Sequence, residues 1–363
     1  MTAPAYPARV TVTTPGLLFA GIAWDDRGFQ VALLDSDGAA VGTPRSFPAG
    51  QVGALTAYLR EIDTSGAELV CVIDSTNGML DGGLMSAGLR VHRADPQVLP
   101  ARPPFGSVDA ASLARTAATR LAELPRLAIQ SGTLTGRGDE SDRWLRDSEP
   151  GTAALTAAGR CVERVASTEK VVALTFDDGP NPPYTHRILD VLERYGVPAT
   201  FFCVGLHASA HTEELARMTE AGHGLANHTW SHPFLPDLSV AEFAAQLERT
   251  DEAVARVAGE QGSRLFRPPY GSRSPQILDW LARQDTGSVV LWDVDAEDWA
   301  LPGADAIART VLGRTAPGSI VLMHDGGGDR SQTAQALPAI VEGLLDRGYR
   351  FSRVDELIAA AGQ

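Results

Sequence analysis

Five short segments in the second half of the chain carry residue types that could together hydrolyse an amide or an ester. They supply imidazoles and carboxylates for a metal, further groups for a general base and a general acid, and proline and aromatic residues for a groove. In chain order the segments are residues 175–180 (TFDDGP), 228–232 (HTWSH), 267–271 (RPPYG), 295–299 (DAEDW) and 322–325 (LMHD). Each alone is equally well explained as a turn, a surface loop or a packing element, so their joint occurrence carries the argument.

His228 and His232 are a candidate pair of metal ligands. If residues 228–232 formed one helical turn, both imidazoles would point to the same side, and imidazole suits zinc and its neighbours. A carboxylate as third ligand would leave positions open for water and substrate. Asp177 and Asp178 are the candidates, since two adjacent acids on apolar ground repel each other and need a cation or a proton.

The two acids follow a segment with the character of a buried strand. Residues 171–176 are apolar and partly β-branched, and residues 179–183 (GPNPP) then break the chain. His324 likewise follows an apolar run, residues 319–323. Carboxylates at the carboxyl end of a barrel strand are where such folds keep their chemistry, so we expect a site at that edge of a sheet.

With these segments in this order, residues of about 168–358 resemble the catalytic domain of the polysaccharide deacetylase family, also called the NodB-homology or carbohydrate esterase family 4 domain. The connecting residues 196–202 (GVPATFF) and 222–224 (GHG) fit the same pattern, and the resemblance covers roughly half the chain. It implies a distorted (β/α) barrel and a metal-dependent carbohydrate deacetylase, a hydrolase acting on non-peptide C–N bonds.

The resemblance also implies a role for each matching residue. The metal, zinc in the first instance, would be bound by Asp178, His228 and His232. Asp177 would be the general base, and Arg267 would orient it.

The remaining implied roles concern the oxyanion, the leaving group and the sugar. The backbone N–H of Tyr270 would help to hold the oxyanion, and His324 would be the general acid, paired with Asp295. The sugar-binding groove would be shaped by Trp299, Leu322 and Pro269. The other histidines (186, 207, 211 and 223) lack ligand spacing to a strand-end acid, so we expect surface or loop roles for them.

Helix signals alternate with the strand-like runs in this half. Ile188, Val191, Leu192 and Tyr195 lie at i, i+3, i+4 and i+7, and Gly196 provides a stop. Residues 239–242 (SVAE) form a capping box ahead of a further helix. Alternation of strand and helix predicts parallel strand pairing.

The first half of the chain predicts a separate, smaller α/β domain, because 363 residues are long for one barrel domain. We expect a tail over 1–16, this domain over 17–130, a linker with some helix over 131–168, and the deacetylase domain over 169–363. A strand hairpin first, then alternating helix and strand, resembles the ribonuclease H-like N-terminal part of DEDD transposases. The acid expected on its first strand falls at Ala23, although Asp74 and Asp109 remain. Since a two-metal nuclease needs several converging carboxylates, we expect a non-catalytic structural or interaction module.

The amino-acid composition limits the classes of molecule that the protein is expected to bind. The net charge of −14 and the pI of about 5.0 argue against nucleic acid and against anionic membrane surfaces. The expected partner is an N-acetylated oligo- or polysaccharide, and the N-terminal module is a candidate surface for a protein partner or self-association. No lysine cluster with a long apolar run begins the chain and no run approaches a membrane span, so a cytoplasmic location is favoured over export by a non-Sec route.

The function predicted from the sequence is therefore hydrolysis of N-acetyl groups on N-acetylglucosamine-containing glycans, such as peptidoglycan fragments or chitin oligomers. Three alternatives stay open at this point: an O-acetyl esterase on xylan, a small-amide hydrolase with the same site, and a non-catalytic glycan- or partner-binding protein.

Overall fold

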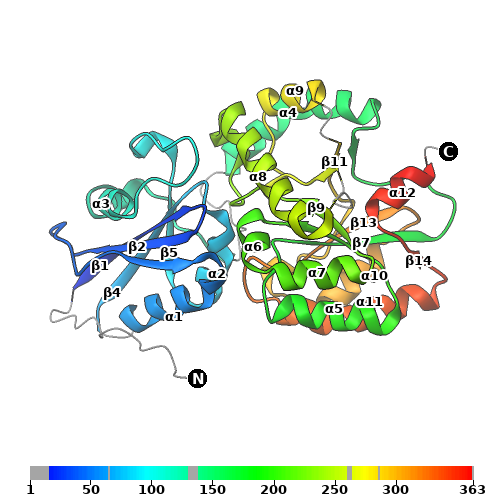
Figure 1. Cartoon of the computed structure of the whole chain (residues 1–363), viewed down its shortest axis with the longest axis horizontal. Coiled ribbons are helices and arrows are strands. Elements are labelled where there is room, and N and C mark those ends of the chain that lie inside the picture. Colours follow the sequence, from blue (N-terminus) through cyan, green and yellow to red (C-terminus); the bar gives the residue numbers. More distant parts are fainter. Residues whose placement is uncertain (1–15, 64–65, 130–137, 260–263, 285–286, 362–363) are drawn as a thin grey trace.

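The computed structural model describes residues 16–63, 66–129, 138–259, 264–284 and 287–361 of the 363-residue chain. The expected tail over residues 1–16 lies outside these ranges except for Gly16. Two α/β units lie side by side, a smaller N-terminal unit and a larger C-terminal unit (Figure 1). The predicted α/β fold class, with two separate sheets, is confirmed.

The N-terminal unit is built on a five-stranded sheet with the order β3-β2-β1-β4-β5. The first three strands pair antiparallel, β4 pairs with β1 in parallel and β5 pairs with β4 in parallel, as a hairpin followed by alternating helix and strand predicts. The likeness to transposases stays a prediction. The elements are β1 (Leu17–Asp25), β2 (Gly28–Leu34), β3 (Arg45–Pro48), α1 (Val52–Asp63), β4 (Glu68–Asp74), α2 (Asp81–Ser86), β5 (Arg90–Ala94) and α3 (Ala110–Arg120).

Both faces of this sheet are covered, because successive side chains of a strand point to opposite sides. Phe19 and Ala23 of β1 join the core beneath α3, whereas Leu18 and Ile22 join the core that includes the apolar face of α1. Helix α3 approaches β1 closely at Gly21. A Cβ atom there would lie 2.0 Å from the carbonyl oxygen of Ala110, so only glycine fits.

The C-terminal unit holds a nine-stranded sheet whose pairings are all parallel, as the strand–helix alternation predicted. The order is β12-β13-β7-β8-β9-β10-β11-β6, and β14 also pairs with β7. The strands are β6 (Cys161–Val162), β7 (Val171–Asp177), β8 (Thr200–Cys203), β9 (Gly224–Asn227), β10 (Leu265–Phe266), β11 (Ser288–Val290), β12 (Val294–Asp295), β13 (Ser319–His324) and β14 (Arg350–Phe351).

Helices surround this sheet (Figure 1). The capping box at Ser239 is present, and the helix that precedes Gly196 ends there because Gly196 adopts φ 61°. The helices are α4 (Gly138–Ala157), α5 (Tyr184–Tyr195), α6 (Gly205–Ala210), α7 (Thr212–Glu220), α8 (Val240–Ala258), α9 (Pro275–Arg283), α10 (Ala304–Arg314), α11 (Ser331–Asp346) and α12 (Val354–Ala361). None of the helices in the described ranges is long and apolar enough to span a membrane, and the cytoplasmic location stays a prediction.

The segment expected as a linker contributes structure to the C-terminal unit. Helix α4 packs on α9, and β6 extends the sheet by pairing with β11. The division of the chain at residue 168 therefore stays a prediction, while the sheet itself begins at Cys161.

The five chemistry-bearing segments all lie at the carboxyl ends of strands. Asp177 ends β7, Asp295 ends β12 and His324 ends β13, while His228 and Arg267 directly follow β9 and β10. Because carboxyl ends of parallel strands meet at one edge, the five segments converge there. Strand β9 was not expected: its four residues, GLAN, are too few and too glycine- and asparagine-rich to predict a strand.

We predict that Gly21→Ala destabilises the N-terminal unit. The added Cβ would also lie 2.5 Å from the backbone nitrogen of Ala114, so α3 must shift, at a cost of about 1–3 kcal/mol. The urea midpoint of unfolding measures this loss. The matched control is Gly53→Ala on exposed α1, where a Cβ meets no atom of the described residues within 4 Å and about 0.4–1 kcal/mol is gained. Equal midpoints for Gly21→Ala and the wild type would contradict the packing.

Candidate active site

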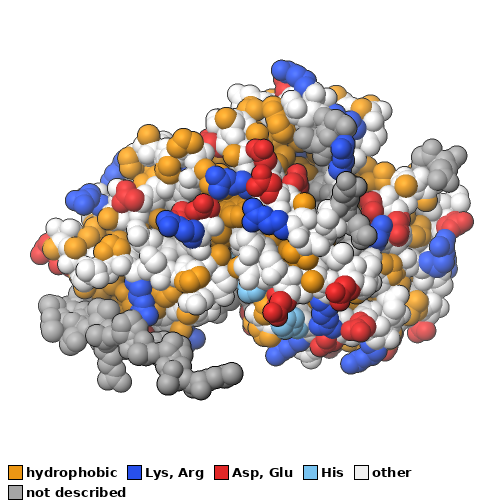
Figure 2. Space-filling view, viewed as in Figure 1, with side chains coloured by type: hydrophobic (Ala, Val, Ile, Leu, Met, Phe, Trp, Pro, Cys, Tyr) orange, Lys and Arg blue, Asp and Glu red, His pale blue; other side chains and the backbone are white. Residues whose placement is uncertain are grey.

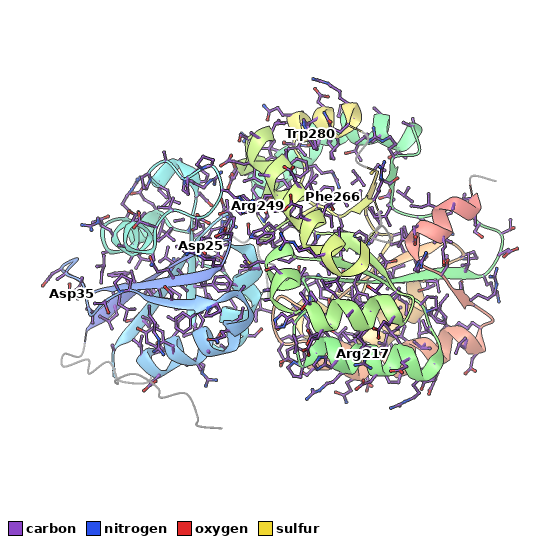
Figure 3. The ribbon with its side chains drawn as sticks, viewed as in Figure 1. Asp25, Asp35, Arg217, Arg249, Phe266 and Trp280 are labelled. Atoms are coloured by element: carbon purple, nitrogen blue, oxygen red, sulfur yellow. The ribbon has the colours of Figure 1, made fainter. Side chains whose placement is uncertain are left out.

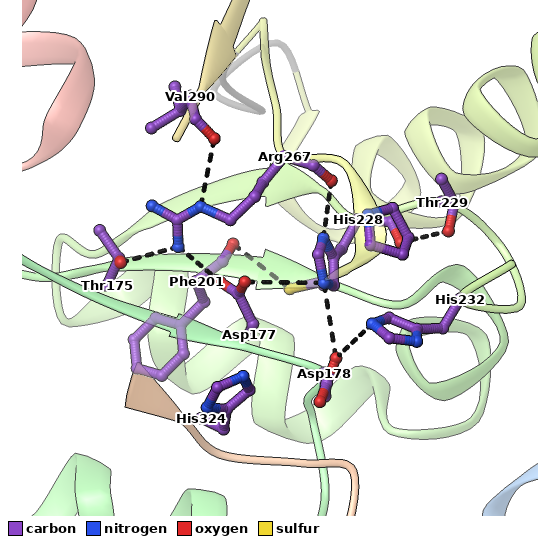
Figure 4. A network of polar contacts seen from close by, with 12 residues as sticks. Thr175, Asp177, Asp178, Phe201, His228, Thr229, His232, Arg267, Val290 and His324 are labelled. Carbon is purple, nitrogen blue, oxygen red and sulfur yellow. Dashed lines mark hydrogen bonds and ion pairs between the residues drawn. The ribbon is translucent and has the colours of Figure 1, made fainter. Parts of the chain in front are cut away.

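A fully buried arginine holds Asp177 at the end of β7. Arg267 donates from Nη1 to Asp177 Oδ1 at 2.7 Å and to Thr175 Oγ1 at 2.8 Å (Figure 4). Its Nε and Nη2 donate to the carbonyl oxygens of Val290 and Leu291, at 3.3 and 3.2 Å. A planar guanidinium anchored at three nitrogens can hold one carboxylate oxygen in a fixed direction, so Oδ2 of Asp177 is left to the site.

Asp178, His228 and His232 form a buried group of metal-ligand side chains. Asp178 Oδ1 lies 3.1 Å from His232 Nε2 and 3.5 Å from His228 Nε2, and one ligand atom of each residue lies within 4.8 Å of the others. Yet this oxygen accepts a hydrogen bond from none of the described residues. Since buried polar atoms are normally satisfied, an orphaned carboxylate oxygen beside two imidazole nitrogens fits a divalent cation.

The charge environment of Asp178 agrees with that fit. Burial raises the pKa of the Asp178 carboxyl, but the imidazoles of His232 and His228 outweigh burial and hold this pKa well below its usual value. Burial also lowers the pKa of His232 to about 3. An ionised carboxylate with neutral imidazole is the protonation state that metal binding requires.

Backbone contacts aim the ligand atoms toward one another. His228 Nδ1 donates to the carbonyl oxygen of Arg267 at 2.7 Å, which leaves Nε2 as the nitrogen that faces Asp178. His207 Nδ1 donates to the carbonyl oxygen of Asp178 at 2.9 Å. Asp178 itself has φ 76°, so it turns away from Asp177.

The two histidine ligands meet through a loop rather than a helix. Residues 228–232 do not form the helical turn on which we based their common direction. The loop folds back through left-handed backbone at Thr229 (φ 67°) and His232 (φ 57°), and the two rings lie 5.0 Å apart. A loop, and not the helical turn considered for the i, i+4 spacing, therefore brings the two imidazoles together.

His324 is held by Asp298 and not by the expected Asp295. Its Nδ1 donates to Asp298 Oδ1 at 2.7 Å, and Asp298 Oδ2 accepts from the backbone N–H of His324 and from Thr333 Oγ1, at 2.9 and 2.7 Å. Burial lowers the pKa of His324, but its pair with fully buried Asp298 prevails and raises it to about 9. Asp295 instead accepts the backbone N–H of Glu297 at 2.7 Å and lies on the pocket wall.

Tyr270 lies between the ligand group and the N-terminal unit. Its backbone adopts φ 58°, and its ring contacts that of His232 edge to face, with centroids 4.4 Å apart. Its hydroxyl donates to Asp81 Oδ2 of α2 at 2.9 Å. The ring contact with His232 and the hydrogen bond to Asp81 therefore fix the Tyr270 side chain. They stabilise the strained backbone whose N–H was expected to bind the oxyanion.

A cavity of about 260 Å³ lies over these residues. Of the expected groove residues, Trp299 and Leu322 line it, whereas Pro269 is buried and does not; its neighbour Pro268 does. Trp292 lines it as well and was not expected.

Three further residues were missed from the sequence. Asp298 had a visible signal, because the segment at 295–299 offers two carboxylates, and the wrong one was assigned to His324. His207 and His223 are buried, not at the surface, and His207 supports Asp178. No spacing to another ligand could have indicated His207, because its contact is with a backbone carbonyl.

The C-terminal unit is similar in sequence to known deacetylases. A protein-family model described as polysaccharide deacetylase matches residues 164–287 of the chain. The chain is 40% identical over 195 residues to the peptidoglycan-N-acetylmuramic acid deacetylase PdaC of Bacillus subtilis; this covers 54% of the chain but only 40% of that longer relative. It is 39% identical over 200 residues to a chitooligosaccharide deacetylase of Sinorhizobium fredii, covering 52% of the chain and 93% of the relative.

A solved structure has the same fold as the C-terminal unit. The Bc1960 peptidoglycan N-acetylglucosamine deacetylase superposes with a TM-score of 0.54 at 35% identity, covering 57% of this chain and 96% of that one. Since almost the whole Sinorhizobium fredii relative is matched at 39% identity, and the family model falls on the unit that carries the site, this chain belongs to the polysaccharide deacetylase family.

Proposed function

We propose that the chain is a metal-dependent deacetylase that hydrolyses N-acetyl groups of N-acetylglucosamine-containing glycans, such as chitin oligomers or peptidoglycan fragments, with zinc as the metal. One observation carries the proposal: an arginine-held carboxylate and a carboxylate-held imidazole line the same cavity as a buried Asp/His/His group. The relatives' names, chitooligosaccharide deacetylase and peptidoglycan-N-acetylglucosamine deacetylase, support the substrate class.

The metal would be held by Asp178, His228 and His232, and it would supply a water of lowered pKa and a polarised acetyl carbonyl. Asp177 takes the proton of the attacking water as general base, since its free Oδ2 lies 3.6 Å from His228 Nε2, beside the ligand group. Arg267 keeps that carboxylate aimed. The backbone N–H of Tyr270 meets the charge that develops on the carbonyl oxygen.

His324 completes the reaction by protonating the departing amine, a poor leaving group in its unprotonated form. Asp298 holds the Nδ1–H of the ring, so that Nε2 carries the transferred proton, and it stabilises the imidazolium. Trp299 offers a flat apolar face on the cavity wall that suits a pyranose ring.

The N-terminal carboxylates have structural uses that support a non-catalytic role for this unit. Asp74 accepts four hydrogen bonds, from the backbone and hydroxyl of Thr76, from Ser107 Oγ and from the N–H of Val108. Asp109 caps α3 by accepting the N–H of Ser112.

Acetate release from a panel of chitin oligomers, peptidoglycan fragments and acetylated xylan tests the proposal. We expect release biased toward the N-acetylated glycans, and Asp177→Asn lowers kcat by about 10²–10⁴-fold because the general base is lost. The matched control is Asp346→Asn, which makes the same change on an exposed residue at the end of α11 and leaves the rate unaltered. Full activity of the Asp177→Asn protein would refute the mechanism, and preferred release from xylan would redirect the substrate to O-acetyl esters.

The acid role of His324 is separable from the base role by the leaving group. With Asp298→Asn the pKa of His324 falls, since the partner that raises it is lost, and amide hydrolysis drops by about 10²-fold or more. Hydrolysis of p-nitrophenyl acetate, whose phenolate leaves without a proton, drops far less. An equal loss on both substrates would show that Asp298 supports the site generally and that His324 is not the acid.

A further inference from the structure

Helix α2 of the N-terminal unit forms part of the catalytic cavity. Asp81, Gly82, Met85 and Ser86 line the same space as Asp177 and His324, although they precede β7 by about ninety residues. They belong to the unit of the five-stranded sheet, which is separate from the sheet that carries the site. Figure 1 shows α2 at the junction of the two units. The wall is thus an addition from the other unit of this chain.

The contact of α2 with the site is close enough to exclude a glycan strand from between them. In the 3-10 turn (Gly78–Leu80) directly before α2, a Cβ on Gly78 would lie 2.0 Å from the hydroxyl oxygen of Tyr270 and 2.3 Å from the carbonyl oxygen of His232. A Cβ on Gly82 would lie 1.9 Å from the carbonyl oxygen of Gly327. Only glycine permits such close approaches. They place α2 and the turn before it in direct contact with the loops that carry Gly327 and the ligand His232.

A polar link fixes the wall at its centre. Asp81 is buried, and its Oδ2 accepts the Tyr270 hydroxyl at 2.9 Å, while its Oδ1 accepts the backbone N–H of Gly82 at 2.6 Å. A buried carboxyl group with these partners presents oxygen atoms in fixed positions on the cavity wall, where they can form hydrogen bonds with sugar hydroxyls.

Contacts away from the cavity hold the N-terminal unit in place. The N–H of Phe234 donates to the carbonyl oxygen of Ser75 at 2.9 Å. Arg102 reaches across to donate to Glu242 and to the carbonyl oxygen of Asp237, both at 2.9 Å. The mostly buried Arg102–Glu242 pair resists screening better than an exposed one.

A second set of contacts lies on the face seen in Figure 3. Arg249 of α8 lies at the junction of the two units, where its guanidinium stacks over the Phe105 ring at 3.9 Å and pairs with Asp26 of the turn between β1 and β2 at 3.7 Å. Figure 2 shows acidic and basic side chains interspersed along this junction. Phe105 also packs on Trp230, within the loop of the histidine ligands. The unit is docked by polar, ionic and aromatic contacts together.

We infer that the N-terminal unit is a fixed specificity wall that closes one side of the deacetylase cavity, so that a short or terminal N-acetylated sugar enters and the interior of a long glycan chain does not. The cavity of about 260 Å³ agrees, because it falls just below the range of about 300–1,000 Å³ that holds drug-sized ligands. This inference rests on the proposed function for its substrate.

Chito-oligosaccharides from dimer to hexamer test the wall with the full-length protein. We expect kcat/KM to level off within about 3-fold beyond the shortest oligomers, and tandem mass spectrometry of the hexamer to find acetate lost from a terminal sugar. Rising kcat/KM with length, with acetate lost from internal sugars, would overturn the inference while leaving the deacetylase proposal intact.

A binding measurement keeps the two proposals separable. Calorimetry on the Asp177→Asn protein is expected to give affinities that level off with oligomer length, and Met85→Trp, which fills the wall side of the cavity, is expected to weaken them at least 10-fold. Ala54→Trp, which adds the same bulk on exposed α1, is the control. Length-independent binding by the Asp177→Asn protein, together with no acetate release by the wild type, would refute the deacetylase and keep the wall. Affinity that grows with length, or no binding by any oligomer, would refute the wall. The wild-type length profile decides even if Met85→Trp does not fold.

Discussion

Two adjacent carboxylates buried at the end of one strand are the constraint on which the site depends. A buried charge is strongly destabilising unless it is paired and hydrogen-bonded, and two side by side also repel each other. The structure gives each a different partner. Asp177 is paired with Arg267, whose own burial is compensated by backbone carbonyl oxygens, while Asp178 turns through φ 76° toward two imidazoles. Neighbouring acids with separate environments can then have separate functions.

The sheet makes this pairing possible. The strands are parallel, so the segments after β7, β9, β10, β12 and β13 meet at one edge, and Asp177 comes into contact with Arg267, its partner 90 residues further along the chain. The N-terminal unit adds a wall at this edge through α2. The ligand group lies within the unit that the family model matches, whereas α2 comes from the N-terminal unit.

Much of the fold could be predicted from local signals, because strand β7, the helix stop at Gly196 and the capping box at Ser239 each have a short-range physical cause. The site was less predictable where a side-chain contact depends on tertiary structure. Residues 295–299 contain two carboxylates, and only the folded conformation of this segment shows that Asp298, and not Asp295, contacts His324. A contact such as that of Asp81 with Tyr270 joins residues 189 positions apart, and no local pattern indicates it.

Metal titration of the stripped protein tests the central claim most directly. After chelation, with metal content verified by mass spectrometry, zinc is added stepwise while acetate release from a chitin oligomer is followed. We predict no release from the stripped protein and a linear recovery that saturates at one equivalent, with neither binding nor recovery in Asp178→Asn. Undiminished release from verified metal-free protein would contradict this prediction.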